Sequence, residues 1–151
     1  MDAGTDELRA EFAQIEAALR SVETRVVALR NDAAVSFLNK TTALENAVKY
    51  YKMRRVRNKI FGTCDLFADP AWDILIDLFI AGEQGRRISV SSACIAAAVP
   101  ATTALRWVSV LEDNGYISRQ PDPNDLRRIF VALTPEVTEK VREYFAGDIG
   151  V

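Results

Sequence analysis

Residues 99–134 read VPATTALRWVSVLEDNGYISRQPDPNDLRRIFVALT and combine the signals of a helix, a glycine stop and a β-hairpin. Four apolar residues recur at helical spacing and gather on one side, which we expect to be buried: Ala104, Trp107, Val108 and Leu111. Pro100 suits the first turn of a helix, and Gly115 supplies a left-handed stop. We therefore predict a helix over about residues 100–114, with polar side chains on its outward face: Thr102, Thr103, Arg106 and Ser109.

The hairpin follows directly. Tyr116 and Ile117 begin a strand, residues 121–125 (PDPND) form the turn, and the returning strand alternates apolar residues that we expect to point inward: Ile129, Val131 and Leu133. The whole hairpin covers about residues 116–133, and basic residues lie near its tip. A helix with an outward polar face beside a basic hairpin favours a protein that reads duplex DNA.

The same residues resemble the winged-helix regulators of the MarR type. The matching pattern runs from Thr102 to Thr134: T-T-x-x-R-x-x-x-x-L-E-x-x-G-Y-I-x-R-x-x-D-P-x-D-x-R-R-x-x-x-x-L-T. The resemblance covers roughly residues 65–146 and fades over the first 60 or so. It implies a homodimer whose recognition helix enters the major groove and whose wing touches the adjacent minor groove or backbone.

The surrounding elements complete an α+β fold that is mostly helical, with a three-stranded wing. Asp69 and Pro70 begin a helix that ends near Gly82, residues 86–88 form a short strand, and Ser89 caps a helix reaching residue 98. Thr134 and Pro135 begin a short C-terminal helix. We expect two domains, a helical extension over 1–61 and a winged-helix domain over 62–151.

The N-terminal third has the heptad pattern of a coiled coil. Apolar residues alternate at steps of four and three: Leu8, Phe12, Ile15, Leu19, Val22, Val26 and Leu29. The register shifts near residues 31–34, which leaves one bent helix or two helices open. A lone helix cannot bury this seam, so we predict that it mediates dimerisation; folding back on the winged-helix domain is the alternative.

Charge is unevenly distributed along a chain of net charge −2. Residues 49–59 hold six basic and no acidic residues, whereas residues 60–151 hold thirteen acidic and eight basic ones. Three cations of the basic segment share a helical face and are candidate phosphate contacts: Lys52, Arg55 and Lys59. A solvated face, or pairing with acidic groups of a partner, is the common alternative for such runs.

The candidate base-reading residues are Thr102, Thr103 and Arg106, with Ser109 on the same face, against the alternative of an ordinary solvated helix surface. In the wing, we expect Arg119 and Arg128 to contact phosphates. Arg127 is a candidate DNA contact that could instead be held by Asp122 or Asp125. Asn124, also a candidate contact, stands where many MarR-type proteins carry a basic residue, which argues against strong insertion into the minor groove.

Other function classes lack support in the sequence. The chain has no histidine, no phosphate-binding loop and no zinc spacing of its two cysteines, so we expect no enzyme, no metal site and no cofactor. Cys64 and Cys94 read as buried thiols rather than redox sensors. Without a signal sequence or membrane-length apolar run, we expect a bacterial, cytoplasmic, nucleoid-associated protein with no membrane partner. An effector of unknown identity leaves no signature, and the alternative function is a winged-helix module that binds proteins.

Overall fold

The computed structural model describes the backbone of residues 3–62 and 65–147, and the side chains of residues 12–62 and 66–147. The chain forms two compact units, residues 1–39 and residues 40–151, and we describe each by itself. The sequence predicts a division after residue 61 instead. Residues 40–61 belong to the second unit because Ala43 and Ala47 are fully buried in its core.

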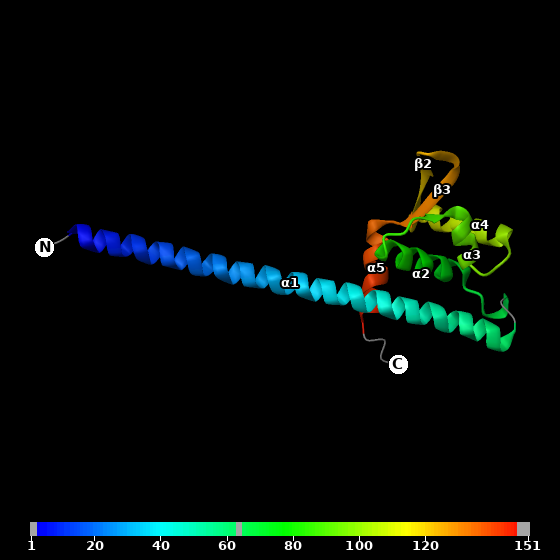
Figure 1. Ribbon diagram of the computed structural model, residues 1–151, viewed down its shortest axis with the longest axis horizontal. Helices are drawn as coiled ribbons and strands as arrows, with labels where there is room; N and C mark the ends of the chain where they lie inside the picture. Colours follow the sequence, from blue (N-terminus) through cyan, green and yellow to red (C-terminus); the bar gives the residue numbers. More distant parts are fainter. Residues whose placement is uncertain (1–2, 63–64, 148–151) are drawn as a thin grey trace. The chain divides into compact units, whose positions relative to one another are not determined.

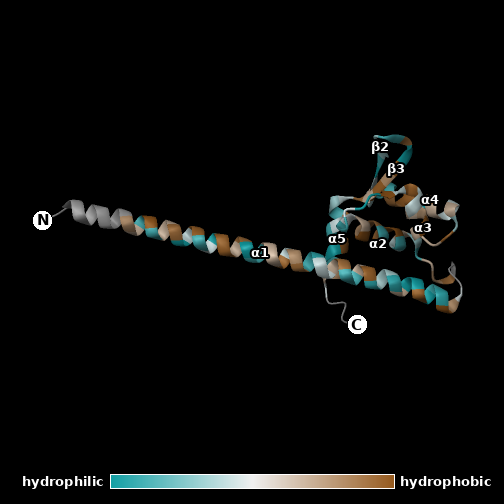
Figure 2. Cartoon of the chain, in the orientation of Figure 1, coloured by the Kyte–Doolittle hydropathy of each residue, from teal (hydrophilic) through white to brown (hydrophobic). Residues whose placement is uncertain are grey.

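Helix α1 (Ala3–Phe61) is one uninterrupted helix of 59 residues. The two possibilities left open by the register shift are thereby resolved in favour of a single helix, and no proline or glycine lies between Thr5 and Ile60 to break it. Every side chain described from residue 12 to residue 42 is exposed. The predicted seam is visible as hydrophobic residues recurring along the first unit (Figure 2); the side chain of Leu8 lies outside the described residues.

The second unit follows the predicted order of elements (Figure 1). After residues 40–61 of α1 it contains the elements η1 (Asp65–Phe67), α2 (Pro70–Glu83), β1 (Ile88–Ser89), α3 (Val90–Ala96), α4 (Ala101–Asp113), β2 (Ile117–Asp122), β3 (Asp125–Leu133) and α5 (Pro135–Ala146). Capping residues set two of these starts as expected. The Asp69 carboxylate accepts a hydrogen bond from the backbone N–H of Trp72, and the Ser89 hydroxyl accepts one from that of Ser92.

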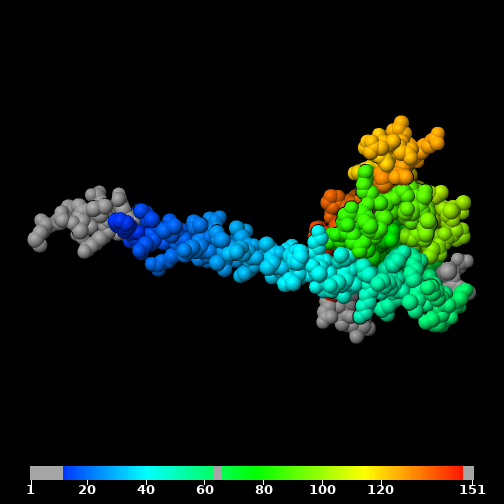
Figure 3. Space-filling view, in the orientation of Figure 1, coloured from blue at the N-terminus to red at the C-terminus, as the bar shows by residue number. Residues whose placement is uncertain are grey.

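The three strands form an antiparallel sheet in the order β1-β3-β2. Ile88 pairs with Val131, which pairs with Arg119 on its other side. The short strand begins at residue 88 rather than 86, because the backbone N–H of Arg86 donates to the Ala81 carbonyl and finishes α2. The β2–β3 hairpin projects from the helical part of the unit (Figures 1 and 3).

The core gathers around α2, whose residues Ile74, Ile76 and Phe79 are almost completely buried. Two predicted core residues are corrected by the structure. Trp107 is 36% exposed because it lies at the edge of the stripe formed by the three buried residues of α4, Ala104, Val108 and Leu111. Ile129 is 38% exposed because it lies beyond the part of β3 that pairs with β1, where the hairpin projects.

Helices α3 and α4 are joined by residues 97–100 and bend by 110°, which is typical of a helix-turn-helix. Among the described residues, no single helix is long and apolar enough to span a membrane, and α3 with α4 meets the length and composition criterion only as this bent pair. Ala98 adopts a left-handed conformation in the turn, with φ of 52°.

We expect Ala98→Gly to stabilise the protein by about 1 kcal/mol, because glycine adopts this conformation without the clash of a Cβ atom. Urea unfolding of the full chain measures the change. Ala97→Gly is the control for sign, since Ala97 has an ordinary helical φ of −61° and a fully buried methyl group, and glycine there should destabilise instead. Equal effects of the two substitutions would show that Ala98 carries no strain.

Candidate nucleic-acid interface

The outward face of α4 is as the sequence predicts. Ala104, Val108 and Leu111 are buried, and four polar residues of the opposite side are exposed: Thr102, Thr103, Arg106 and Ser109. Arg106 has no ion-pair partner among the side chains that the structure describes. Its guanidinium group is therefore available to an external acceptor such as a phosphate or the O6 and N7 atoms of guanine.

The wing turn is organised by Asp122, which is buried although it lies in an exposed hairpin. Its carboxylate accepts a hydrogen bond of 2.9 Å from the backbone N–H of Asn124 and lies 4.0 Å from a guanidinium nitrogen of Arg128. Asp125 similarly accepts from the backbone N–H of Arg127, at 3.0 Å. The side chain near Asp122 is thus that of Arg128, rather than that of Arg127 as the sequence suggested.

Arg119 joins β2 to α4. Its Nε atom lies 2.9 Å from a carboxylate oxygen of Glu112, and its Nη2 atom donates to the Ser109 hydroxyl at 3.2 Å. Two of the predicted contact residues, Arg119 and Ser109, therefore bind each other. Their contact links α4 to β2, and Glu112 offsets part of the positive charge of Arg119.

A polar groove of about 400 Å³ lies between the start of α3 and the wing. It is lined by two serines, three arginines and three other residues: Ser89, Ser91, Arg119, Arg127, Arg128, Val90, Asp125 and Ile129. Hydroxyl and guanidinium donors converging in one groove are suited to oxygen anions such as phosphate. The groove thereby brings together three of the predicted wing residues. Asn124 lies outside it, at the exposed hairpin turn.

The basic segment of α1 is divided between structural and exposed cations. Arg55 donates to the Tyr51 hydroxyl at 2.9 Å and to the carbonyl oxygen of Ala96, at the start of the α3–α4 turn. Its guanidinium also lies over the Tyr51 ring. Lys52 and Lys59 are exposed. The tyrosines Tyr50 and Tyr51 are partly buried against the core, as expected for packing residues.

Sequence reasoning missed several arginine contacts. Arg54 forms a buried ion pair with Asp73 at 2.6 Å. Arg57 donates to the Phe67 carbonyl at 2.7 Å, and Arg87 lies over the Phe130 ring. Of these contacts, only the Arg54–Asp73 pair had a signal in the sequence. Asp73 stands among apolar residues of α2, where an unpaired charge is costly.

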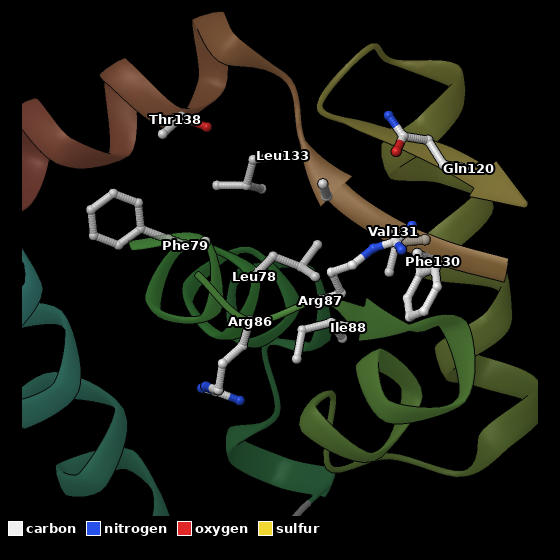
Figure 4. Close-up of a pocket in the computed structure, with 12 residues that line it drawn as sticks. Leu78, Phe79, Arg86, Arg87, Ile88, Gln120, Phe130, Val131, Leu133 and Thr138 are labelled. Atoms are coloured by element: carbon white, nitrogen blue, oxygen red, sulfur yellow. The ribbon is translucent and has the colours of Figure 1, made fainter. Parts of the chain in front are cut away.

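A second cavity, of about 200 Å³, lies between α2, the sheet and α5 (Figure 4). Its walls are mainly apolar side chains such as Leu78, Phe79 and Val131, with Arg86 and Arg87 beside them. Cys94 is buried and burial raises the pKa of its thiol, which agrees with the interpretation as a packing residue. Cys64 lies outside the described residues.

We expect Arg55→Met to destabilise the protein by about 1–3 kcal/mol, because it removes a charged donor from the Ala96 carbonyl while keeping the length of the side chain. Lys52→Met, on the same helix but exposed, is the control and should change stability by less than about 0.5 kcal/mol. Urea unfolding provides the comparison. Equal stabilities of the two variants would show that Arg55 does not anchor the turn.

No protein-family model and no curated protein matches the chain. Among solved structures, it is similar to MepR of S. aureus in a DNA-binding conformation, with 18% identity over 64% of this chain and 69% of that one and a TM-score of 0.46. A transcriptional regulator of Thermotoga maritima has 27% identity, coverage of 77% and 72%, and a TM-score of 0.42. A probable transcriptional regulator of Pseudomonas aeruginosa has 26% identity, coverage of 68% and 72%, and a TM-score of 0.42. By its own element and strand order the chain is a winged helix-turn-helix protein, and its residues 102–134 resemble the MarR-type regulators.

Proposed function

We propose that the protein is a sequence-specific regulator of transcription that binds double-stranded DNA as a homodimer. The observation that carries this proposal is the exposed face of α4, where Arg106 stands beside Thr102 and Thr103. This helix is the second of a helix-turn-helix whose two helices, α3 and α4, are bent by 110°. The arginine-lined groove of the wing supports it, because phosphates flank any helix that enters the major groove. In this mechanism α4 reads base edges.

The wing groove would position the protein on the duplex. Arg127 and Arg128 would bind phosphate oxygens together with the hydroxyls of Ser89 and Ser91. Arg119 would contribute less charge because Glu112 holds it. Lys52 and Lys59 would contact the backbone beside the half-site, whereas Arg55 would act indirectly by holding the α3–α4 turn.

The exposed seam of α1 supports the homodimer. Its described members are large apolar side chains without cover in the single chain: Phe12, Ile15, Leu19, Val22, Val26 and Leu29. Pairing with a second copy would bury this stripe as knobs in holes. A two-fold dimer of such units reads two half-sites, and helix-turn-helix dimers place them about one helical turn of DNA apart.

A protein-interaction module is the second candidate. The excess of acidic residues over 60–151 favours it, as do the exposed side chains of Leu105 and Val110 on α4. An acidic unit is repelled by the DNA backbone unless its cations are concentrated on one surface. A sequence-specific regulator should therefore still bind DNA at physiological salt, whereas a protein-interaction module should not.

Selection from a random-sequence DNA pool tests the proposal. The full-length chain is incubated with the pool at several salt concentrations, and the retained duplexes are sequenced. We expect a two-fold symmetric motif and a linear fall of log affinity with log salt, because each bound phosphate releases counterions. Absence of an enriched motif near physiological salt would contradict sequence-specific DNA binding and favour the protein-interaction module.

Two arginine substitutions separate base reading from positioning. We expect Arg106→Ala to cost about 1–3 kcal/mol and to relax the preference at one base position of the motif. Arg128→Ala should weaken binding to all sequences alike and reduce the salt slope by about one. Fluorescence anisotropy on the selected duplex and its single-base variants measures both. An unchanged base preference in Arg106→Ala would refute the placement of α4 in the major groove.

A further inference from the structure

The tip of the wing carries an apolar side chain where its neighbours are polar. Leu126 is 86% exposed, the most exposed of the large hydrophobic residues in the described part of the chain. It begins the outer part of β3, next to the turn formed by Pro123 and Asn124. A single exposed leucine is ordinary on a protein surface. Leu126 differs from an ordinary exposed leucine in its hydrogen-bonded backbone and in the two arginines that follow it.

The backbone on both sides of Leu126 is held in place. The Asp122 carboxylate accepts from the backbone N–H of Asn124, and the Asp125 carboxylate accepts from that of Arg127. Pro121 and Pro123 fix two further φ angles of the tip. The β2–β3 register shifts at this end of the hairpin, so these hydrogen bonds, rather than strand pairing, order the backbone beside Leu126. Insertion of an ordered tip loses less conformational entropy than insertion of a flexible one. The hairpin as a whole projects from the helical part of the unit (Figure 3).

The two residues that follow Leu126 are cationic and line the groove suited to phosphate: Arg127 and Arg128. Along a strand, they lie within about 7 Å of Leu126. The minor groove is roughly 6 Å wide between its sugar-phosphate walls. An arginine bound to either wall would bring the neighbouring leucine to the groove. The two guanidinium groups favour DNA over an apolar protein surface as its partner, and Asp122 and Asp125 offset part of their charge.

Resting on the proposed function, we propose that Leu126 is an apolar wedge that enters the minor groove, unstacks a base step and bends the duplex. Leucine and proline side chains can part stacked bases from the minor groove and kink DNA by about 20–90° towards the major groove. Asn124 is neutral and cannot attract the tip to the minor groove by its charge. The apolar contact of Leu126 with the bases would hold the tip there instead. Pyrimidine–purine steps unstack most easily, so a duplex with such a step under the wing costs less energy to bend. Leu126 would thereby select for the base sequence at that step.

The test uses the full-length protein and the duplex recovered by selection. Donor and acceptor dyes at its two ends report bending by energy transfer, and 2-aminopurine placed at successive steps reports unstacking. We expect the unmodified protein to bend the duplex and to raise 2-aminopurine fluorescence at one step under each wing. Replacing that pyrimidine–purine step by a stiff step should lower affinity on the order of tenfold.

Leu126→Ala should abolish the bend, the fluorescence rise and the step preference while leaving the base preference of Arg106 intact. Leu126→Phe, which keeps a large apolar group, should retain the fluorescence rise. Leu66→Ala is the matched control, because Leu66 is 79% exposed and lies in η1 rather than in the wing. Both leucines are exposed, so these variants should fold normally.

Bending and 2-aminopurine fluorescence that are the same in Leu126→Ala and the unmodified protein would overturn the wedge while leaving sequence-specific DNA binding in place. That result would point to a protein partner for Leu126. Failure of the unmodified protein to retain any DNA would instead overturn the proposed function, and the wedge with it. A bend that is lost equally in Leu66→Ala would also overturn the assignment to the wing tip.

Discussion

The second unit depends on a charge pair inside its core. Arg54 of α1 and Asp73 of α2 are both buried, and the Nε atom of Arg54 lies 2.6 Å from the Oδ1 atom of Asp73. Burial alone lowers the pKa of Arg54, but the hydrogen bond and the charge of Asp73 outweigh this and raise the pKa overall. Loss of one partner from such a pair typically costs about 3–5 kcal/mol, because the other charge stays buried without compensation. This pair therefore fixes the last part of α1, residues 40–61, against α2.

The contacts beside this pair extend the constraint to the rest of the unit. Arg55, the next residue, donates to the Ala96 carbonyl and holds the helix-turn-helix turn. More than two helical turns earlier, Asn46 donates to the Phe145 carbonyl at 2.8 Å and holds α5. Because one helix binds α2, the turn and α5, the outward face of α4 has a defined position in the unit. The polar surface of α4 is thus supported by residues that never reach it.

Local signals made much of this arrangement predictable. Apolar spacing and the caps at Asp69 and Ser89 predicted α2, α3 and α4, and the alternation beyond residue 116 predicted the hairpin. The contacts of Arg55 with Ala96 and of Arg119 with Glu112 were not predictable, because they join elements whose spacing only the folded chain sets. Trp107 was misplaced for a related reason: periodicity identifies a stripe, but its margin depends on what packs there.

The parts of α1 that belong to the two units differ in what covers their apolar side chains. In the second unit Ala43 and Ala47 are fully buried, and larger residues such as Leu44 pack against the same core. Over residues 12–29 large side chains such as Phe12 and Ile15 remain exposed. Apolar residues at alternating steps of three and four suit packing against a second helix. The proposed homodimer therefore rests on a seam that the single chain leaves uncovered.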